Sequence, residues 1–401
     1  MTHASINRSI DPYLYLVLVL TFLSTVPGMF LGLTDTHVSP VLGSILFGVA
    51  IFGAAFILSW AAEAAQIDIS ESLAVAILAL VAVLPEYAVD FVFAWRAAHD
   101  PSQAHFAIAN MTGANRLLVG LGWPAVLFIY VLAKRKKEIV LDKSQHVEIF
   151  YLAMATLYSF TIPLKGSLSL FDTVILVTLF GLYTRRLMQM ETTEPELIGP
   201  VRIVTALRKT PRKVCTAFFF LYAGIVILYV AEPFADSLIK MGTQLGISQF
   251  LLVQWLAPIA SEAPEFIVAA TWTIRGASGA AMKALISSKV NQWTLLVGTI
   301  PLVYAISGSS IQPFVLDDKQ IHELVLTAAQ SLFAVALLVN LRLNRKAGLL
   351  LFVLFAAQLV VEQIRLEVAI IYVLLAIVYH IANRKQLIPA ALTGLGIGKN
   401  R

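Results

Sequence analysis

The chain has 401 residues, of which 59% are hydrophobic and only 13% are charged. A soluble core does not need so many apolar residues, so this composition excludes an ordinary soluble domain and indicates a polytopic membrane protein. The single cysteine, Cys215, excludes an internal disulfide and a thiolate metal cluster. The net charge of +5 predicts no nucleic-acid partner, because excess Lys and Arg in a membrane protein mark its cytoplasmic loops.

Twelve apolar runs are long enough, at roughly 17 to 30 residues, to be interpreted as membrane-spanning helices. In the first half of the chain they lie at 13–33, 41–65, 70–97, 103–132, 147–164 and 168–187. In the second half they lie at 214–232, 246–273, 279–307, 320–342, 347–363 and 367–384. The first run is too long for a signal peptide and has no cleavage pattern, so we expect a retained helix.

The positions of Lys and Arg predict which loops face the cytoplasm. With a cytoplasmic N-terminus, 21 of the 29 basic residues fall in inside segments and five fall in outside loops. We therefore expect a multi-pass cell-membrane protein with both termini in the cytoplasm. The remaining three, Arg116, Lys283 and Lys289, lie within or at the ends of spans.

A Pro-Glu pair interrupts one apolar run in each half of the chain, at Pro85-Glu86 and at Pro264-Glu265. A carboxylate is costly near the bilayer centre, and a proline there removes one helical hydrogen bond, so each pair indicates function. On the predicted topology the two helices run in opposite directions, as in secondary transporters built from inverted repeats with broken helices. The alternative is a proline kink with a neutral, hydrogen-bonded glutamic acid.

Both Pro-Glu elements supply the oxygen atoms that hard cations prefer. Each proline frees a carbonyl one turn earlier, at Val81 and at Ala260, beside a carboxylate. Calcium takes about six to eight oxygen ligands, and sodium uses the same types in smaller number. Neither element contains His or Cys, which argues against zinc, copper or iron.

A second polar position lies 24 residues after each glutamate, at Asn110 and at Lys289. Amides and hydroxyls around these positions are candidates to complete a cation shell. The alternative for each of them is hydrogen bonding between helices, which is the usual role of Ser, Asn and Gln in membrane bundles. For Asn115 and Asn291 we expect helix contacts rather than ligation.

On these residues the sequence resembles the Ca2+/cation antiporter superfamily, which includes the sodium/calcium exchangers. The segments similar to its first repeat are Leu84-Pro85-Glu86 and Asn110-Met111-Thr112-Gly113-Ala114-Asn115. The segments similar, more loosely, to its second repeat are Ser261-Glu262-Ala263-Pro264-Glu265 and Ser287-Ser288-Lys289-Val290-Asn291. The resemblance implies alternating access, with Glu86 and Glu265 as shared cation ligands and Asn110 assisting them.

The resemblance also implies an all-α fold of about 12 transmembrane helices, with a ten-helix core of two inverted repeats, discontinuous core helices and one extra helix at each end. The predicted segments are an N-terminal tail and extra helix (1–40), a first repeat (41–187), a cytoplasmic linker (188–213), a second repeat (214–363) and an extra C-terminal helix and tail (364–401).

The sequence departs from the family pattern at the site itself. Ala82 and Val83 stand where the family has hydroxyl residues, and Glu262 and Lys289 stand where it has a hydroxyl and an Asp or Asn. We expect Lys289 and Glu262 to pair, which leaves the charge of the two Pro-Glu carboxylates nearly unchanged. The alternative is that Lys289 snorkels to the membrane interface.

Asp90 lies four residues after Glu86 and therefore on the same helical face. We expect it to be a second-site ligand or the mouth of the ion path, and the alternative is a structural pair with Arg116.

A solvated outside turn is the expected setting of Glu362, Arg365 and Glu367. The complete set of predicted cation ligands is Glu86, Glu265, Asn110, Ser261, Glu262, Ser287, Ser288 and Asp90, with Lys289 modulating their charge.

Charge repulsion predicts the activity. Two carboxylates in a poorly solvated cavity repel each other unless a divalent cation, monovalent cations or protons occupy the site, and exchange of occupants is antiport. We expect export of Ca2+ or a similar cation in exchange for H+ or Na+, and the missing hydroxyls favour H+, which needs only a carboxylate. A monovalent cation/proton antiporter and a cation channel are the alternatives.

The sequence has no nucleotide-binding P-loop and no His-Glu-x-x-His pattern, so it predicts neither an ATP-driven pump nor an enzyme. No cofactor is expected. Cations and the lipid bilayer are the expected partners, and assembly into a homo-oligomer stays open.

Overall fold

The structure is a computed structural model, and it describes residues 11–34, 36, 38–68, 84–190, 197 and 199–397. All twelve predicted apolar runs overlap helices, which confirms the predicted all-α membrane fold. Eight of the described helices are long and apolar enough to cross a bilayer. Most of the predicted run 70–97 before Leu84, with Val81, Ala82 and Val83, lies outside the described residues.

The first half of the chain contains α1 (Pro12–Thr34), α2 (Pro40–Ala65), α4 (Leu84–Ala97), α5 (Ala104–Leu117), α6 (Trp123–Lys134), α7 (His146–Ser159), α8 (Thr161–Lys165) and α9 (Leu170–Leu187). The second half contains α10 (Val201–Thr205), α11 (Lys209–Leu245), α12 (Gln249–Arg275), α13 (Ser278–Asn291), α14 (Val297–Gly308), α15 (Asp318–Leu338), α16 (Arg345–Val360), α17 (Arg365–Ala382) and α18 (Arg384–Leu395). Short 3-10 turns form η2 (Pro101–Gln103), η4 (Lys143–Gln145) and η6 (Glu362–Ile364).

Three features of the helices differ from the prediction. α11 extends over 37 residues, far beyond the predicted run 214–232, because charged residues such as Glu232 and Asp236 end the apolar run without ending the helix. α18 follows the last predicted span as an additional helix. Four strands of two or three residues were also not predicted, because segments this short leave no periodic pattern in the sequence.

Polar residues at the helix starts explain several boundaries. The side chain of Asp317 accepts a hydrogen bond from the backbone N–H of Gln320, whose own side chain accepts one from the N–H of Asp317. Asn344 caps α16 by accepting a bond from the N–H of Ala347. Such caps satisfy backbone groups that a helix end leaves unpaired.

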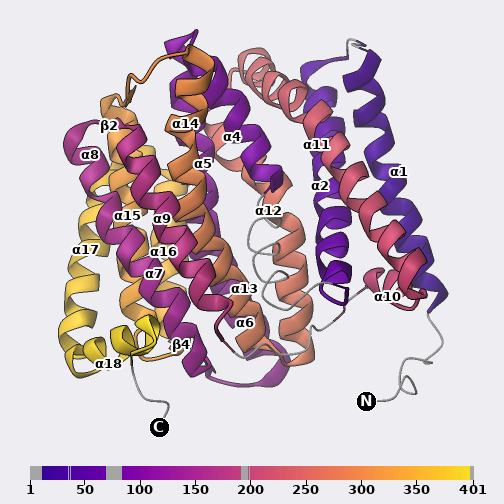
Figure 1. Cartoon of the computed structure of the whole chain (residues 1–401). Coiled ribbons are helices and arrows are strands. Elements are labelled where there is room, and N and C mark those ends of the chain that lie inside the picture. The colour runs from indigo at the N-terminus through magenta and orange to yellow at the C-terminus, as the bar shows by residue number, and fades with distance from the viewer. Residues whose placement is uncertain are drawn as a thin grey trace. The chain divides into compact units, whose positions relative to one another are not determined.

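The chain divides into two compact units. The first comprises the described parts of 1–89, 191–252 and 260–264. In it, α2 packs against both α1 and α11, and the three helices lie side by side in Figure 1. Arg212 donates two hydrogen bonds to Asp68, at 2.7 and 2.8 Å, which joins the end of α2 to the start of α11 and lowers the pKa of Asp68.

The second unit comprises residues 90–190, 253–259 and 265–401. Its helices contain a clear internal repeat, because α5 and α13 each have 14 residues and α6 and α14 each have 12. A π-helical turn separates the members of each pair, η3 (Leu118–Gly122) in one and η5 (Gln292–Leu296) in the other. Every boundary in the second copy lies 174 residues after its counterpart.

Two small antiparallel sheets link the copies of this repeat. β1 (Glu138–Val140) pairs with β4 (Arg342–Asn344), and β2 (Ser167–Leu168) pairs with β3 (Phe314–Val315). β1 follows α6, and β3 follows the equivalent helix α14, so β1 and β3 are counterparts. β2 and β4 are then the other pair of counterparts. Each sheet therefore joins one strand from each copy, as inverted repeats related by a two-fold axis require. The labels β2 and β4 mark the two sheets at opposite ends of the second unit in Figure 1.

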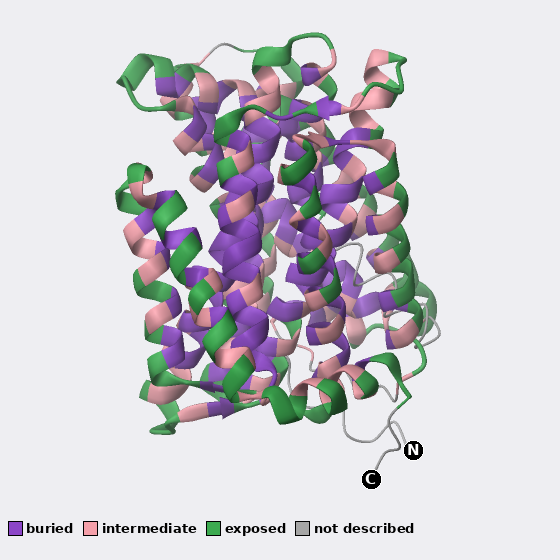
Figure 2. Ribbon diagram, turned by 90° about the vertical axis from the view of Figure 1, so that its left-hand side faces the viewer, coloured by how far each residue is buried: buried purple, intermediate pink, exposed green. Residues whose placement is uncertain are grey.

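Burial within the second unit is high along α15, whose residues from Leu324 to Leu338 are almost all buried. Many exposed residues of other helices are large and apolar, among them Leu164, Phe171 and Leu374. Figure 2 shows buried and exposed residues alternating along the helices. An exposed apolar surface of this extent indicates contact with lipid.

Gly113 lies where α5 passes close to the backbone of α12. A Cβ atom at this position would lie 1.8 Å from the backbone oxygen of Gln254. Gly181, in α9, has open space around it. The two glycines therefore form a matched pair for testing the packing.

We expect Gly113→Ala to lower the free energy of unfolding by about 3 kcal/mol or more, because a backbone oxygen cannot move aside as a side chain can. Gly181→Ala should leave it unchanged or raise it by up to about 1 kcal/mol, because alanine favours a helix. Thermal unfolding of the purified protein in detergent measures both. Equal melting temperatures would contradict the close crossing of α5 and α12.

Candidate cation-binding residues

The two Pro-Glu pairs lie on α4 and α12. Glu86 is buried on α4, while Glu262 is buried and Glu265 half-buried on α12. Each of these helices contributes residues to both compact units, so Glu86 belongs to the first unit and Glu265 to the second. The expectation that these two carboxylates share one site therefore stays a prediction. Ser261 is buried and belongs with Glu262 to the first unit.

Asp90 and Asn110 are two predicted ligands that the structure brings together. The side-chain amide of Asn110 donates a hydrogen bond of 3.0 Å to Asp90, and both residues are buried. Within the part of the chain that the structure describes, one oxygen of each side chain, Oδ2 of Asp90 and Oδ1 of Asn110, has no hydrogen-bond partner. A buried pair with two free oxygens from a carboxylate and an amide is suited to a hard cation.

The alternative pairing of Asp90 with Arg116 is wrong. Arg116 is buried and forms an ion pair with Glu323 of α15. Its Nη1 donates a bond of 2.9 Å to Gln358, and its guanidinium lies 5.2 Å from the ring centre of Trp255. The side-chain partner of Asp90 is therefore Asn110 and not Arg116.

Lys289 does not snorkel to the interface, because it is fully buried. Its ammonium donates a bond of 2.7 Å to Oδ1 of Asn115 and lies 4.4 Å from the ring centre of Trp293. These contacts confirm Asn115 as a residue of helix contact. The predicted pair of Lys289 with Glu262 stays a prediction.

In the repeat, the residue equivalent to Lys289 is not Asn110, which the sequence spacing suggested. At the constant shift of 174 residues, Lys289 is the counterpart of Asn115, and Asn110 is the counterpart of Ala284. The equal spacing of 24 residues misleads because the connection between α12 and α13 is shorter than that between α4 and α5. Lys289 and Asn115 are therefore equivalent residues that contact each other.

Ser287 and Ser288 follow Lys283 on α13 and differ in their contacts. The hydroxyl of Ser287 is 2.7 Å from that of Tyr183 on α9. Ser288 is buried, and its hydroxyl has no hydrogen-bond partner in the described ranges of the chain. Ser288 is therefore the freer of the two candidate ligands.

A buried network that the sequence did not predict surrounds Glu323. Both its oxygens accept bonds from arginines, one from Arg365 and one from Arg116, and Gln254 donates a further bond of 2.8 Å. Arg365 also donates a bond of 3.1 Å to Gln254. The network joins α5, α12, α15, α16 and α17.

The prediction of a solvated turn at 362–367 is accordingly wrong for Arg365, which is buried. Glu367 is exposed, and Glu362 is partly exposed. A signal for this network was present in the sequence. Glu323 is an ionisable residue inside the predicted span 320–342, and such residues are functional or paired by default. What the sequence did not reveal was which arginines would reach it.

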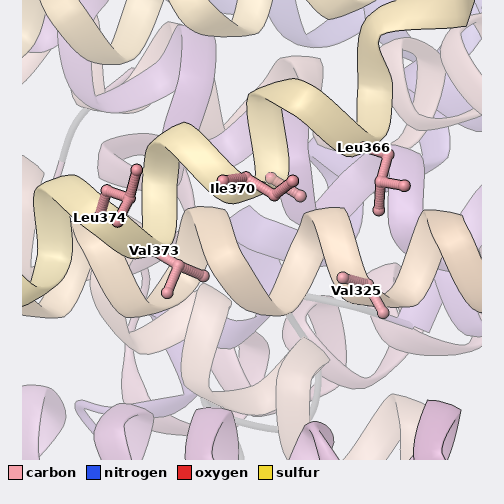
Figure 3. A pocket seen from close by; sticks show the side chains of 6 residues that line it. Val325, Leu366, Ile370, Val373 and Leu374 are labelled. Carbon is pink, nitrogen blue, oxygen red and sulfur yellow. The ribbon is translucent and has the colours of Figure 1, made fainter.

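Two observations limit where a cation can bind. Among the described residues, no group of three or more His, Cys, Asp or Glu is placed to hold a metal ion. The hollow in Figure 3 lies between α15 and α17 and is lined by the apolar residues Val325, Leu366, Ala369, Ile370, Val373 and Leu374. A cation would find no oxygen ligand there, so that hollow is not a cation site.

Comparisons with known proteins identify the family of the chain. The sequence profile of sodium/calcium exchanger proteins matches residues 39–188 and 216–362. A solved structure of the H+/Ca2+ exchanger CAX is 42% identical over 96% of this chain and 98% of its own, with a TM-score of 0.93. A comparison with curated proteins found no match.

Two more distant structures share the fold. Native YfkE is 16% identical over 88% of this chain and 99% of its own, with a TM-score of 0.63. The sodium-calcium exchanger NCX_Mj, soaked with Na+ and Sr2+, is 19% identical over 83% of this chain and 99% of its own, with a TM-score of 0.54.

The Glu323 network yields a stability prediction. Glu323→Gln removes the carboxylate that two buried guanidinium groups share, so we expect the free energy of unfolding to fall by about 3–5 kcal/mol. Glu362→Gln is the control, because that carboxylate is partly exposed and lies 3.8 Å from Arg365, and it should cost less than about 1 kcal/mol. Thermal unfolding in detergent compares them, and similar losses in both variants would contradict the role given to Glu323.

Proposed function

Because the chain belongs to the sodium/calcium exchanger family of secondary transporters, we propose that it exchanges Ca2+ for H+ across a cell membrane. The transported ions bind in turn to one set of oxygen ligands, and the loaded protein alternates between inward-facing and outward-facing forms. A downhill flux of H+ then drives Ca2+ uphill without a nucleotide. The protein is a transporter and not an enzyme.

The observation that carries this proposal is the buried pair of Asp90 and Asn110, in which one oxygen on each side chain has no partner among the described residues. Such oxygens bind a hard cation or, at the carboxylate, a proton. The remaining proposed ligands are Glu86, Glu265, Ser261, Glu262, Ser287 and Ser288. The similarity to a solved H+/Ca2+ exchanger supports H+ as the counter-ion.

The residues before Glu86 support H+ over Na+. Ala82 and Val83 offer no side-chain oxygen to a Na+ shell. A proton forms a covalent bond to a carboxylate and needs no shell. We propose that both termini face the cytoplasm, as the positions of Lys and Arg indicate.

Uptake of radioactive Ca2+ into proteoliposomes under an imposed gradient tests the function. We expect an acid interior to accelerate uptake by wild-type protein and an imposed Na+ gradient to have little effect. Glu86→Gln, Glu265→Gln and Asp90→Asn should each slow H+-driven uptake at least about tenfold, which corresponds to about 1.4 kcal/mol. Glu367→Gln, which changes an exposed carboxylate, should behave as wild type.

Other outcomes of the same experiment identify the alternatives. Acceleration by Na+ alone would make Na+ the driving ion. Uptake that follows the Ca2+ gradient and ignores both counter-ions would identify a channel. H+ movement driven by a monovalent cation, without Ca2+ uptake, would identify a monovalent cation/proton antiporter.

A charge-reversal cycle tests the proposed pair of Lys289 and Glu262. If the two charges compensate each other, Lys289→Glu and Glu262→Lys should each abolish H+-driven uptake, and the double variant should recover part of it. Initial uptake rates, normalised to the amount of protein in the vesicles, measure the recovery. A double variant no faster than the slower single variant would refute the pairing.

A further inference from the structure

Glu148 is a buried carboxyl group that the proposed cation site does not use. It is the third residue of α7, at the end that the predicted topology places toward the cytoplasm. The residue is fully buried, and neither carboxyl oxygen has a hydrogen-bond partner on another of the described residues. An ionised carboxylate in such a place is costly, so the group is stable there when it binds a proton or a cation.

The charges around Glu148 decide between these two ligands. Lys283 of α13 and Asp142, in the connection before η4, both act on it electrostatically. The N–H of Ser144 donates a bond of 2.8 Å to Asp142 and lowers the pKa of that carboxyl, which therefore stays ionised and attracts Lys283. A nearby ammonium repels metal ions, and one carboxylate offers far fewer than the about six to eight oxygens that Ca2+ takes. A proton needs only the carboxyl itself.

The elements packed against α7 carry further titratable groups, most of them near the ends of helices. In α15, the residues from Leu324 to Leu338 include none. α18 contacts α7 through Gly394, near its last turn, whereas its charged residues lie in its first turn. The titratable and charged groups on α7 and on its neighbours are His146, Tyr151, Tyr158, Lys143, Lys165, Asp172, Tyr183, Arg185, Arg186, Lys283, Lys289, Asp318, Lys319, His322, Glu323, Arg384 and Lys385.

A line of polar groups leads from Glu148 to the candidate ligands of α13. Gln145 donates a bond of 3.0 Å to the carbonyl of Gly279, which fixes the start of α7 beside the start of α13. Lys283 and Ser287 follow Gly279 at intervals of four residues, so they lie on one face of the helix and rise about 12 Å along it.

Tyr183 links this line to Glu148. It is fully buried on α9, its ring centre lies 5.6 Å from that of Tyr151, which is about one turn after Glu148 on α7, and its hydroxyl is 2.7 Å from that of Ser287. A hydroxyl donates one hydrogen bond while it accepts another, so two hydroxyls in contact can pass a proton. Ser287 adjoins Ser288 and Lys289, which belong to the proposed cation site.

We propose that Glu148 is a proton-binding residue through which H+ passes between the predicted cytoplasmic side and the cation site, with the hydroxyls of Tyr183 and Ser287 as relays. For a proton that leaves the cation site, Ser287 takes it up and gives its own proton to Tyr183, and Tyr183 gives its own to Glu148. Each hydroxyl ends neutral, and one proton has moved. The proton passes between Tyr183 and Glu148 after a side-chain rotation or through one bridging water.

This inference rests on the proposed Ca2+/H+ exchange, but proton binding by Glu148 can be measured separately. Infrared difference spectra of the purified protein between acidic and alkaline buffers should contain a protonated-carboxyl band that Glu148→Gln lacks. If the spectra of wild type and Glu148→Gln are the same, Glu148 does not titrate and the inference is wrong. This result does not depend on whether the protein transports Ca2+.

Transport then tests the relay. In proteoliposomes, Glu148→Gln should slow H+-driven Ca2+ uptake about tenfold or more, whereas Ca2+/Ca2+ exchange, which moves no net proton, should fall far less. Tyr183→Phe removes the hydroxyl and keeps the ring, and it should act in the same direction. Glu367→Gln is the matched control on an exposed carboxylate.

Two outcomes in transport would overturn the relay. One is equal loss of both kinds of exchange in Glu148→Gln, which would mean a structural role. The other is H+-driven uptake at the wild-type rate in both Glu148→Gln and Tyr183→Phe. Absence of H+-driven uptake in wild type would instead refute the proposed function, and the infrared result would still decide whether Glu148 binds a proton.

Discussion

Glu323 holds two buried arginines, and the packing of the second unit depends on this shared carboxylate. Away from water, a guanidinium without a counter-charge costs several kcal/mol, so Arg116 and Arg365 constrain the helices that carry them. Their hydrogen bonds to Gln254 and Gln358 extend the constraint to α12 and α16. α5, which carries Asn110, is therefore fixed against the part of α12 that belongs to the same unit. Asn110, a proposed cation ligand, gains a defined position from this arrangement.

The helices could be predicted from the sequence because their cause is local. An apolar run long enough to cross a bilayer must form a helix, since hydrocarbon offers no partner for the backbone. The small sheets could not be predicted in this way. β1 pairs with β4 only after the two copies of the repeat have come together, and three residues such as Glu138–Val140 leave no pattern of their own.

The choice of partners at the candidate site also depends on distant parts of the chain. Arg116 pairs with Glu323, 207 residues away, although Asp90 is much nearer in sequence. Sequence spacing identified Lys289 as unusual but gave it the wrong counterpart, because a connection of different length shifts the register between helices. The types of residue at the site were thus predictable, and two of its proposed ligands, Asp90 and Asn110, do meet. Their neighbours required the fold.

The buried polar groups of the second unit separate into two kinds. Within the described residues, the positive charges of Arg116, Arg365 and Lys289 all have partners: a carboxylate for the arginines and an amide for the lysine. By contrast, Asp90 keeps one oxygen free and Glu148 keeps both. A fully bonded charge resists change, because any movement leaves it unpaired in a medium that screens poorly. An acceptor with free oxygens gains by binding a cation or a proton and can release it again. In a protein that exchanges cations, we therefore infer that the paired charges form the fixed frame and the free carboxyl oxygens are the groups whose occupancy changes during transport.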